Sequence, residues 1–127
     1  MINHDTATLS KLSDTYLTVR TPDEDIRGRT VKDKDGNDVG RVDDLLIDGR
    51  DQKIRFMQVE SGGFLGLGET KSFIPVEAIT HITDDDVYIN QSSALVAGAP
   101  RYDPGLAEQD YYRNVYGYYG YPPYWGI

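Results

Sequence analysis

The sequence predicts a mainly β protein, with a small barrel or sandwich at its centre. Between residues 25 and 90, short runs rich in β-branched and apolar residues alternate with turn residues about every ten positions. We therefore divide the chain into a polar segment of residues 1–24 that holds a short strand, a barrel domain of residues 25–90, and a C-terminal segment of residues 91–127.

Six short strands are expected in the central segment. Asp35-Gly36-Asn37 forms the first turn, because Gly36 accepts a positive φ. Pro75 begins a single helical turn over residues 75–78, since its fixed φ suits the first helical position. The expected strands cover residues 29–32, 39–47, 53–60, 70–74, 79–82 and 87–89.

The strand at 53–60 is apolar on both faces. Ile54 and Phe56 point to one face, and Met57 and Val59 point to the other. A strand with this pattern is covered on both sides, whereas the outside of a small barrel is normally solvated. We therefore expect the flanking segments or a second subunit to cover its outer face.

The flanking segments carry weaker signals. Residues 16–20 alternate in polarity and predict a short extra strand before the barrel. After the barrel, Ser92 and Ser93 can cap a short helix that Gly98 stops. Residues 104–115 show apolar side chains at roughly helical spacing and predict a second helix.

The last residues, YGYYGYPPYWGI, have an unusual composition. Seven of the ten tyrosines lie between Tyr111 and Tyr124, with Trp125 beside them. The glycines and prolines among them oppose regular structure. The tail is either a disordered or partly packed appendage, or an adhesive segment whose rings cover this barrel, a second copy or another protein.

Composition narrows the classes of partner and compartment. The 127 residues suffice for one domain, and 21 acidic against 13 basic residues give a net charge of −8. An acidic chain repels phosphates, so nucleic acid is disfavoured and a protein partner or a cation is favoured. The absence of cysteine suits a reducing cytoplasm. We expect no signal peptide and no transmembrane segment, although peripheral membrane contact stays open.

Four motifs in the central segment together resemble the PRC-barrel family, and the resemblance covers residues 25–90. The first opens the strand at 29–32, the second lies in the strand at 39–47, the third is a glycine-rich loop and the fourth ends the strand at 70–74. They are Ile26-Arg27-Gly28-Arg29, Gly40-Arg41-Val42-Asp43-Asp44-Leu45-Leu46, Gly62-Gly63-Phe64-Leu65-Gly66-Leu67-Gly68 and Ile74-Pro75-Val76.

The resemblance implies a compact six-stranded β-barrel. Members of the family occur in the H subunit of the bacterial photosynthetic reaction centre, in the C-terminal half of the ribosome maturation factor RimM, and as small stand-alone proteins. In those settings the barrel binds other proteins and is not known as a catalyst. The reaction-centre subunit has a membrane helix before its barrel and RimM has a second barrel, whereas this chain has only about 24 residues there.

The resemblance therefore implies a stand-alone, non-catalytic adaptor that binds a protein partner. A homodimer is also expected, because the strand at 53–60 is apolar on both faces and the loop from Phe64 to Leu67 and the tyrosine tail offer apolar side chains for self-association. Two alternatives stay open at this point. One is a photosynthetic reaction-centre-like or peripheral membrane assembly factor, and the other is a ribosome-associated factor that resembles RimM. No cofactor is expected for any of the three.

Acidic and glycine-rich stretches are candidate ligand sites. Asp33 to Asp38 is similar to a calcium loop, but an EF-hand needs glycine at position six and glutamate at position twelve, where this chain has Asp38 and Asp44. An acidic hairpin turn is the better interpretation, as it is for residues 84–86. The glycine-rich loop lacks the Lys-Ser/Thr end of a phosphate-binding loop.

Titratable residues indicate no catalytic set and no metal site. Asp43 and Asp44 are adjacent in a strand and point to opposite faces, which is poor geometry for a carboxylate pair. One of them is expected to form an ion pair with an arginine, either Arg27, Arg29 or Arg41. The two histidines, His4 and His81, have no cysteine or clustered carboxylate near them in sequence.

Three features are candidates for partner binding: the outer face of the strand at 53–60, the glycine-rich loop and the tyrosine tail. The loop either tucks into the barrel mouth or presents its apolar side chains to a partner. The tail does not suit single-stranded nucleic acid, because that needs a basic groove. The candidate residues are Phe56 of the strand, Phe64, Leu65 and Leu67 of the loop, and Tyr111, Tyr112, Tyr116, Tyr118, Tyr119, Tyr121, Tyr124 and Trp125 of the tail.

Overall fold

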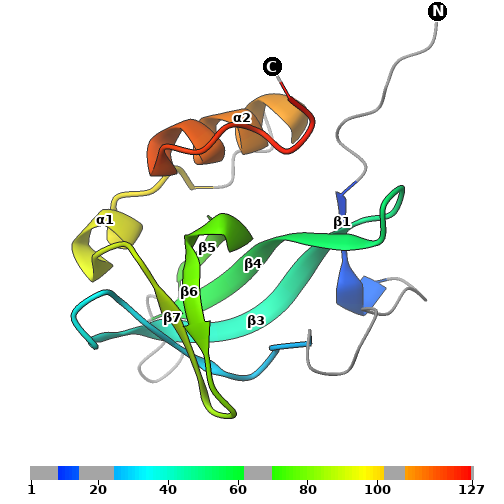
Figure 1. Cartoon of the computed structure of the whole chain (residues 1–127). Coiled ribbons are helices and arrows are strands. Elements are labelled where there is room, and N and C mark those ends of the chain that lie inside the picture. The colour runs from blue at the N-terminus through cyan, green and yellow to red at the C-terminus, as the bar shows by residue number, and fades with distance from the viewer. Residues whose placement is uncertain (1–8, 15–24, 62–69, 102–107, 127) are drawn as a thin grey trace, which may run out of the picture.

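The computed structural model describes residues 9–14, 25–61, 70–101 and 108–126. Strands dominate the first three of these ranges, and both α-helices follow the strands in the chain (Figure 1). In chain order the elements are β1 (Leu9–Lys11), η1 (Leu12–Asp14), β2 (Thr30–Lys32), β3 (Asp38–Asp48), β4 (Lys53–Ser61), β5 (Thr70–Pro75), η4 (Val76–Ala78), β6 (Ile79–Ile82), β7 (Asp86–Ile89), α1 (Ser93–Ala97) and α2 (Glu108–Tyr119).

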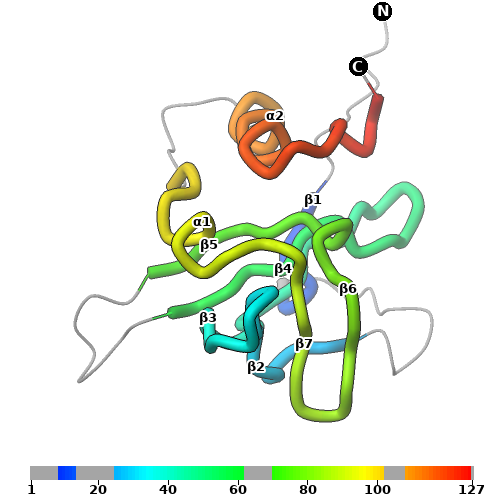
Figure 2. Tube along the Cα trace, turned by 60° about the vertical axis from the view of Figure 1, so that its left-hand side comes forward, coloured from blue at the N-terminus to red at the C-terminus, as the bar shows by residue number. Residues whose placement is uncertain are grey.

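The strands form one sheet in the order β5-β4-β3-β2-β7-β6, and β1 pairs with β3 off this path. All pairs are antiparallel except β2 with β7, which run parallel. The β3–β4 pairing shifts register twice, once after Val42 and once after Leu46. Such irregularities increase local twist and bend a strand, and the sheet curls into a half-barrel (Figures 1 and 2).

Two glycines shape the hairpin of β2 and β3: one allows its turn, and the other allows β4 to approach closely. Gly36 has φ +86° in the turn between β2 and β3, as its turn sequence predicts. Gly40 lies on β3 where β4 passes very close, because an added Cβ would stand 2.3 Å from the backbone oxygen of Glu60. A side chain at position 40 would therefore push β3 and β4 apart.

The six predicted strands are confirmed, with ends within one residue of the expected positions. The predicted helical turn is the 3-10 helix Val76–Ala78, with Pro75 at its N-cap rather than inside it. Helix α1 is confirmed as well, and the Ser92 side chain caps it by accepting a hydrogen bond from the Leu95 N–H. The fold is therefore mainly β, as a PRC-type barrel requires.

The N-terminal strand differs from its predicted position. The prediction at residues 16–20 lies outside the described residues. The described strand is β1, which pairs Leu9 with Asp48 and Lys11 with Leu46 at the far end of β3. Leu9 and Leu12 are both buried there, so this short segment extends the core beyond the six-stranded order.

The prediction that residues beyond Val115 lack regular structure is wrong for Tyr116 to Tyr119, which belong to α2. A glycine inside a helix costs about 1 kcal/mol, but burial of aromatic rings on both sides of Gly117 outweighs that cost. The helix ends in a Schellman motif at Gly120, whose φ is +84°. The Tyr121 N–H donates to the Tyr116 carbonyl, and the Gly120 N–H donates to the Gly117 carbonyl.

Candidate partner-binding surfaces

Helix α2 lies across the outer side of β4 and β5, as both views of the chain show (Figures 1 and 2). The ring of Phe56 on β4 lies 5.0 Å from the ring of Tyr112 and 4.8 Å from that of Tyr116. Phe73 on β5 contacts Tyr111 and Tyr112 edge-on, each at 5.9 Å. The outer face of β4 is thus covered by a flanking segment, one of the two coverings that its sequence predicted.

The tyrosine hydroxyls of α2 differ in whether they have a hydrogen-bond partner. The Tyr118 hydroxyl donates to the Leu95 carbonyl at 2.5 Å, and the Tyr111 hydroxyl donates to the Pro100 carbonyl at 3.2 Å. The Tyr119 hydroxyl is buried without a hydrogen-bond partner among the described residues, and burial raises its pKa above the ordinary value. Two hydrogen bonds therefore tie α2 to α1 and to the segment after α1, whereas the buried hydroxyls of Tyr116 and Tyr119 have no hydrogen-bond partner among the described residues.

The segment after α2 contacts β4 through the side chain of Arg55. The Arg55 guanidinium lies 4.3 Å from the centre of the Tyr124 ring, a cation–π arrangement. Arg55 also forms ion pairs with Asp48 at 3.4 Å and with Asp51 at 3.1 Å. Trp125 packs against the Tyr124 ring with centroids 5.1 Å apart. The C-terminal rings are thus held in place by charge as well as by apolar contact.

The predicted partner-binding residues fall into three groups. Phe56, Tyr111, Tyr112, Tyr116 and Tyr119 are buried within this chain. Phe64, Leu65 and Leu67 lie outside the described residues. The remaining rings are half-buried and so keep part of their surface toward solvent: Tyr118, Tyr121, Tyr124 and Trp125.

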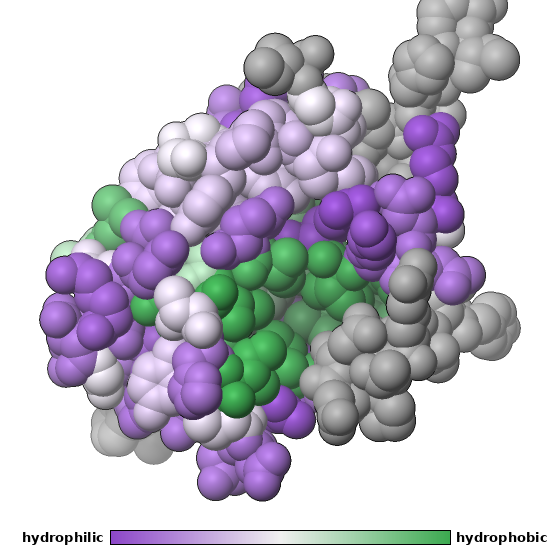
Figure 3. Space-filling view, viewed as in Figure 1, coloured by the Kyte–Doolittle hydropathy of each residue, from purple (hydrophilic) through white to green (hydrophobic). Residues whose placement is uncertain are grey.

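Two apolar surfaces were not predicted. Ile82 is 43% exposed on β6, which lies at one edge of the sheet. The sequence carried a signal for it, since Thr80 and His81 are polar and leave little of that strand for the core. Figure 3 shows the second surface, where hydrophobic side chains gather in a hollow below α2, over β3 and β4.

The acidic turn after β2 is held together by hydrogen bonds to one carboxylate, that of Asp33. The buried Asp33 carboxylate accepts hydrogen bonds from the backbone N–H groups of Asp35, Asn37 and Ser93, at 2.8 to 3.0 Å. Burial raises the pKa of Asp33, but these hydrogen bonds outweigh burial and lower it to about 2. The carboxylate therefore holds α1 against the hairpin, and the hairpin-turn interpretation is confirmed.

Asp43 and Asp44 do point to opposite sides, with Asp43 exposed and Asp44 buried. The predicted arginine partners are wrong. Asp43 pairs with Lys71 at 3.0 Å, and that contact is the main reason for its lowered pKa. Asp44 accepts a hydrogen bond from the Ser13 hydroxyl at 2.5 Å. Both partners are set by strand register and by η1, which local sequence does not reveal.

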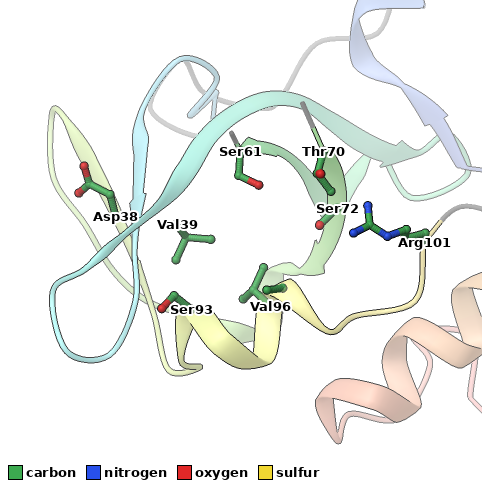
Figure 4. Close-up of a pocket in the computed structure, with 9 residues that line it drawn as sticks. Asp38, Val39, Ser61, Thr70, Ser72, Ser93, Val96 and Arg101 are labelled. Carbon is green, nitrogen blue, oxygen red and sulfur yellow. The ribbon is translucent and has the colours of Figure 1, made fainter. Parts of the chain in front are cut away.

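A small cavity of about 150 Å³ opens between β3, β5 and α1 (Figure 4). Its walls carry hydroxyl groups, two valines and one arginine, from segments far apart in the chain. Because no two of these segments form a recognisable motif, sequence reasoning missed the site. The residues that define its chemistry are Val39, Ser61, Ser72, Ser93, Val96 and Arg101.

Metal ligation finds little support in the described ranges, where no group of three or more His, Cys, Asp or Glu residues is placed to hold an ion. In the same ranges, no helix has the length and hydrophobicity that crossing a membrane requires.

Comparison with known proteins gives the family. The model of the PRC-barrel domain matches residues 22–96, which is more than half of the chain. A search of curated proteins finds no match. The matched range contains β2 to β7, the hairpin turn at Asp33 and most of α1. The chain therefore belongs to the PRC-barrel family.

Proposed function

We propose that this protein is a non-catalytic adaptor that binds a protein partner and takes part in assembly. The observation that carries the proposal is the family itself, since the PRC-barrel is a domain of protein interaction and assembly. The polar groups that the sequence raised as candidate sites support this view, because Asp33 and Asp43 are engaged in hydrogen bonds and ion pairs. Absence of cysteine suits action in the cytoplasm.

The proposed contact surface is the set of half-buried rings at the C-terminal end, Tyr121, Tyr124 and Trp125. Aromatic residues and arginine carry much of the binding energy in protein interfaces. Here Tyr124 already stacks on Arg55, and Arg113 lies 5.9 Å from the Trp125 ring. Rings that are held in one arrangement lose little conformational freedom on binding, which favours affinity.

Site-specific photo-crosslinking tests this surface. The photoreactive residue p-benzoylphenylalanine is placed at Trp125 in the full chain, and at exposed Lys34 as the matched control. We expect one discrete protein to be captured in source-cell extract from position 125, and to be lost when Tyr121 is also changed to Ser. Equal capture at both positions, or none at either, contradicts the proposal.

Homodimerisation is a second candidate, and exposed Ile82 on the edge strand β6 is the observation that favours it. Two sequence features that first suggested a dimer, the outer face of β4 and the tyrosines, cover each other within one chain. Light scattering should show a dimer that Ile82→Lys converts to a monomer. A monomer at every concentration rules the dimer out.

The narrower alternatives are a peripheral membrane or reaction-centre-like assembly role and a ribosome-associated role. Fractionation of source-cell extract separates them from the adaptor proposal. Sedimentation with membranes would favour the first alternative, and migration with ribosomal particles on a sucrose gradient would favour the second. The net charge of −8 opposes both anionic lipid and ribosomal RNA.

A further inference from the structure

The cavity between β3, β5 and α1 has a composition suited to one kind of ligand. Ser61 and Ser72 contribute hydroxyls from β4 and β5, and Ser93 contributes a third from α1. Figure 4 shows the Arg101 guanidinium extended toward Ser72. Hydroxyl and guanidinium groups together are donors for an oxyanion.

The described residues around the cavity do not neutralise the positive charge of Arg101. Arg101 forms no ion pair with any residue in the described part of the chain. Asp38 lies at the rim, but its carboxylate pairs with Lys32 and is turned away from the cavity in Figure 4. Among the described residues the Arg101 charge is thus unpaired, which suits a ligand with a single negative charge and disfavours a dianion in a chain of net charge −8.

Size and apolar lining narrow the ligand further. A volume of about 150 Å³ corresponds to roughly five water molecules, enough for a short side chain. Val39 on β3 and Val96 on α1 both line the cavity and can pack against methylene groups (Figure 4). A guanidinium binds a carboxylate through two parallel N–H···O hydrogen bonds.

We propose that this cavity receives a glutamate or aspartate side chain of a protein partner. The methylene groups would lie between Val39 and Val96, and the carboxylate would accept hydrogen bonds from Arg101 and Ser72. This inference rests on the proposed function, because it names the group that a protein partner presents. It adds a specificity for acidic residues at a surface separate from the C-terminal rings.

Titration of the full chain with small probes, followed by amide chemical shifts, tests the cavity without a partner. The main probe is N-acetylglutamate methylamide, which has a side-chain carboxylate and a blocked backbone. We expect saturable shifts at Ser72, Ser93 and Arg101. The neutral glutamine analogue should bind about tenfold more weakly, because it lacks the charge that the guanidinium recognises.

Two further probes distinguish other sources of an anion. N-acetylglycine mimics a free chain end, and inorganic phosphate mimics a phosphorylated residue. Both should bind more weakly than the glutamate probe, since neither places methylene groups between the valines. Tighter binding of either one, or equal binding of the glutamate and glutamine probes, overturns the proposal.

Variants then locate the binding. Arg101→Gln should weaken the glutamate probe about fivefold, as expected for an exposed guanidinium–carboxylate contact. Ser72→Val should weaken it as well, because it removes a hydroxyl and fills part of the cavity. The control Arg113→Gln changes an exposed arginine of α2 that is paired with Asp110 and should leave binding unchanged. Unchanged binding in Arg101→Gln contradicts the proposal.

Failure of this inference is distinguishable from failure of the proposed function. If the crosslinked partner is captured from position 125 but no probe shifts the cavity residues, only the acidic specificity is wrong. If the glutamate probe binds but no partner is captured, the cavity is a carboxylate site and the adaptor proposal fails.

Discussion

The strand core and the α2 interface are both buried, yet they are built from different chemistry. The strand core uses aliphatic side chains such as Val31, Leu45 and Ile74, which are fully buried and have no side-chain polar group to satisfy. The α2 interface uses tyrosines, and the hydroxyls of Tyr116 and Tyr119 lie within the buried layer. Apolar burial alone stabilises the first region, whereas the second depends on where each hydroxyl lies.

Phe56 lies where the two regions meet, so its removal should have the largest effect. Phe56→Ala deletes a ring that is fully buried between Tyr112 and Tyr116. We expect a loss of about 3–5 kcal/mol in the free energy of unfolding, from lost burial and the cavity left behind. Urea denaturation measures it, with Asn114→Ala, at an exposed position of α2, as control. A loss no larger than the control would mean that α2 does not depend on β4.

Arg55 connects the sheet to the C-terminal rings and is the next test. Arg55→Met keeps most of the side-chain length but removes the ion pair with buried Asp48 and the contact with Tyr124. We expect a loss of about 2 kcal/mol. Tyr124→Leu removes only the ring contact and should cost less than 1 kcal/mol by the same reasoning. Equal losses in thermal unfolding would assign the whole effect to the ring.

Asp33 tests the connection between the barrel and α1. Its pKa is about 2 in the folded state, below the ordinary 3.8, so the folded state binds fewer protons than the unfolded state between these values. Stability is therefore fully present above about pH 4 and is lost as the pH falls toward 2. Asp33→Ala should lower the melting temperature by roughly 3–6 °C at pH 7. It should also reduce the loss of stability between about pH 4 and pH 2, which is the acid limb of the stability curve.

The control for that experiment is Asp35→Ala, an exposed acid in the same turn. It should keep both the melting temperature and the acid limb of the unmodified chain. An acid limb of equal slope in Asp33→Ala would show that other carboxylates cause it.

Tyr119 gives the smallest expected effect and the sharpest contrast within α2. Tyr119→Phe removes a buried hydroxyl that has no partner among the described residues, so stability should be unchanged or rise by up to about 1 kcal/mol. Tyr118→Phe removes the hydrogen bond to the Leu95 carbonyl and should cost about 1 kcal/mol. A loss in both variants on urea denaturation would indicate that the Tyr119 hydroxyl has a partner.

Most of the barrel could be predicted from sequence, because its signals are local. Short runs of β-branched and apolar residues located each strand from β2 to β7, and turn residues such as Gly36 placed the connections. Helix α2 was harder, since glycine and proline suggested irregular structure. Its length depends on packing of Tyr116 and Tyr119 against distant parts of the chain, and such tertiary contacts override local propensity.

The candidate surfaces were less predictable than the fold. Aromatic composition left the tail as either an appendage or an adhesive segment, and only the three-dimensional arrangement separates buried Tyr112 from half-buried Trp125. The cavity at Arg101 is lined by strand and helix residues. Their proximity depends on strand register and on the hydrogen bond by which Asp33 holds the start of α1. Periodicity reports which face a side chain occupies, but it does not report which distant residue lies opposite.

The parallel pairing of β2 with β7 has a consequence for the order in which this protein folds. Thr30 of β2 lies opposite Asp86 of β7. The strand β2, at the middle of the sheet, therefore pairs with a strand more than fifty residues later in the chain. Contacts of long sequence separation slow folding, because a large loop must close first. During synthesis on the ribosome, β3 and β4 form a hairpin early, and Phe56 stays uncovered until α2 emerges. We therefore expect the nascent chain to be most prone to aggregation before α2 emerges.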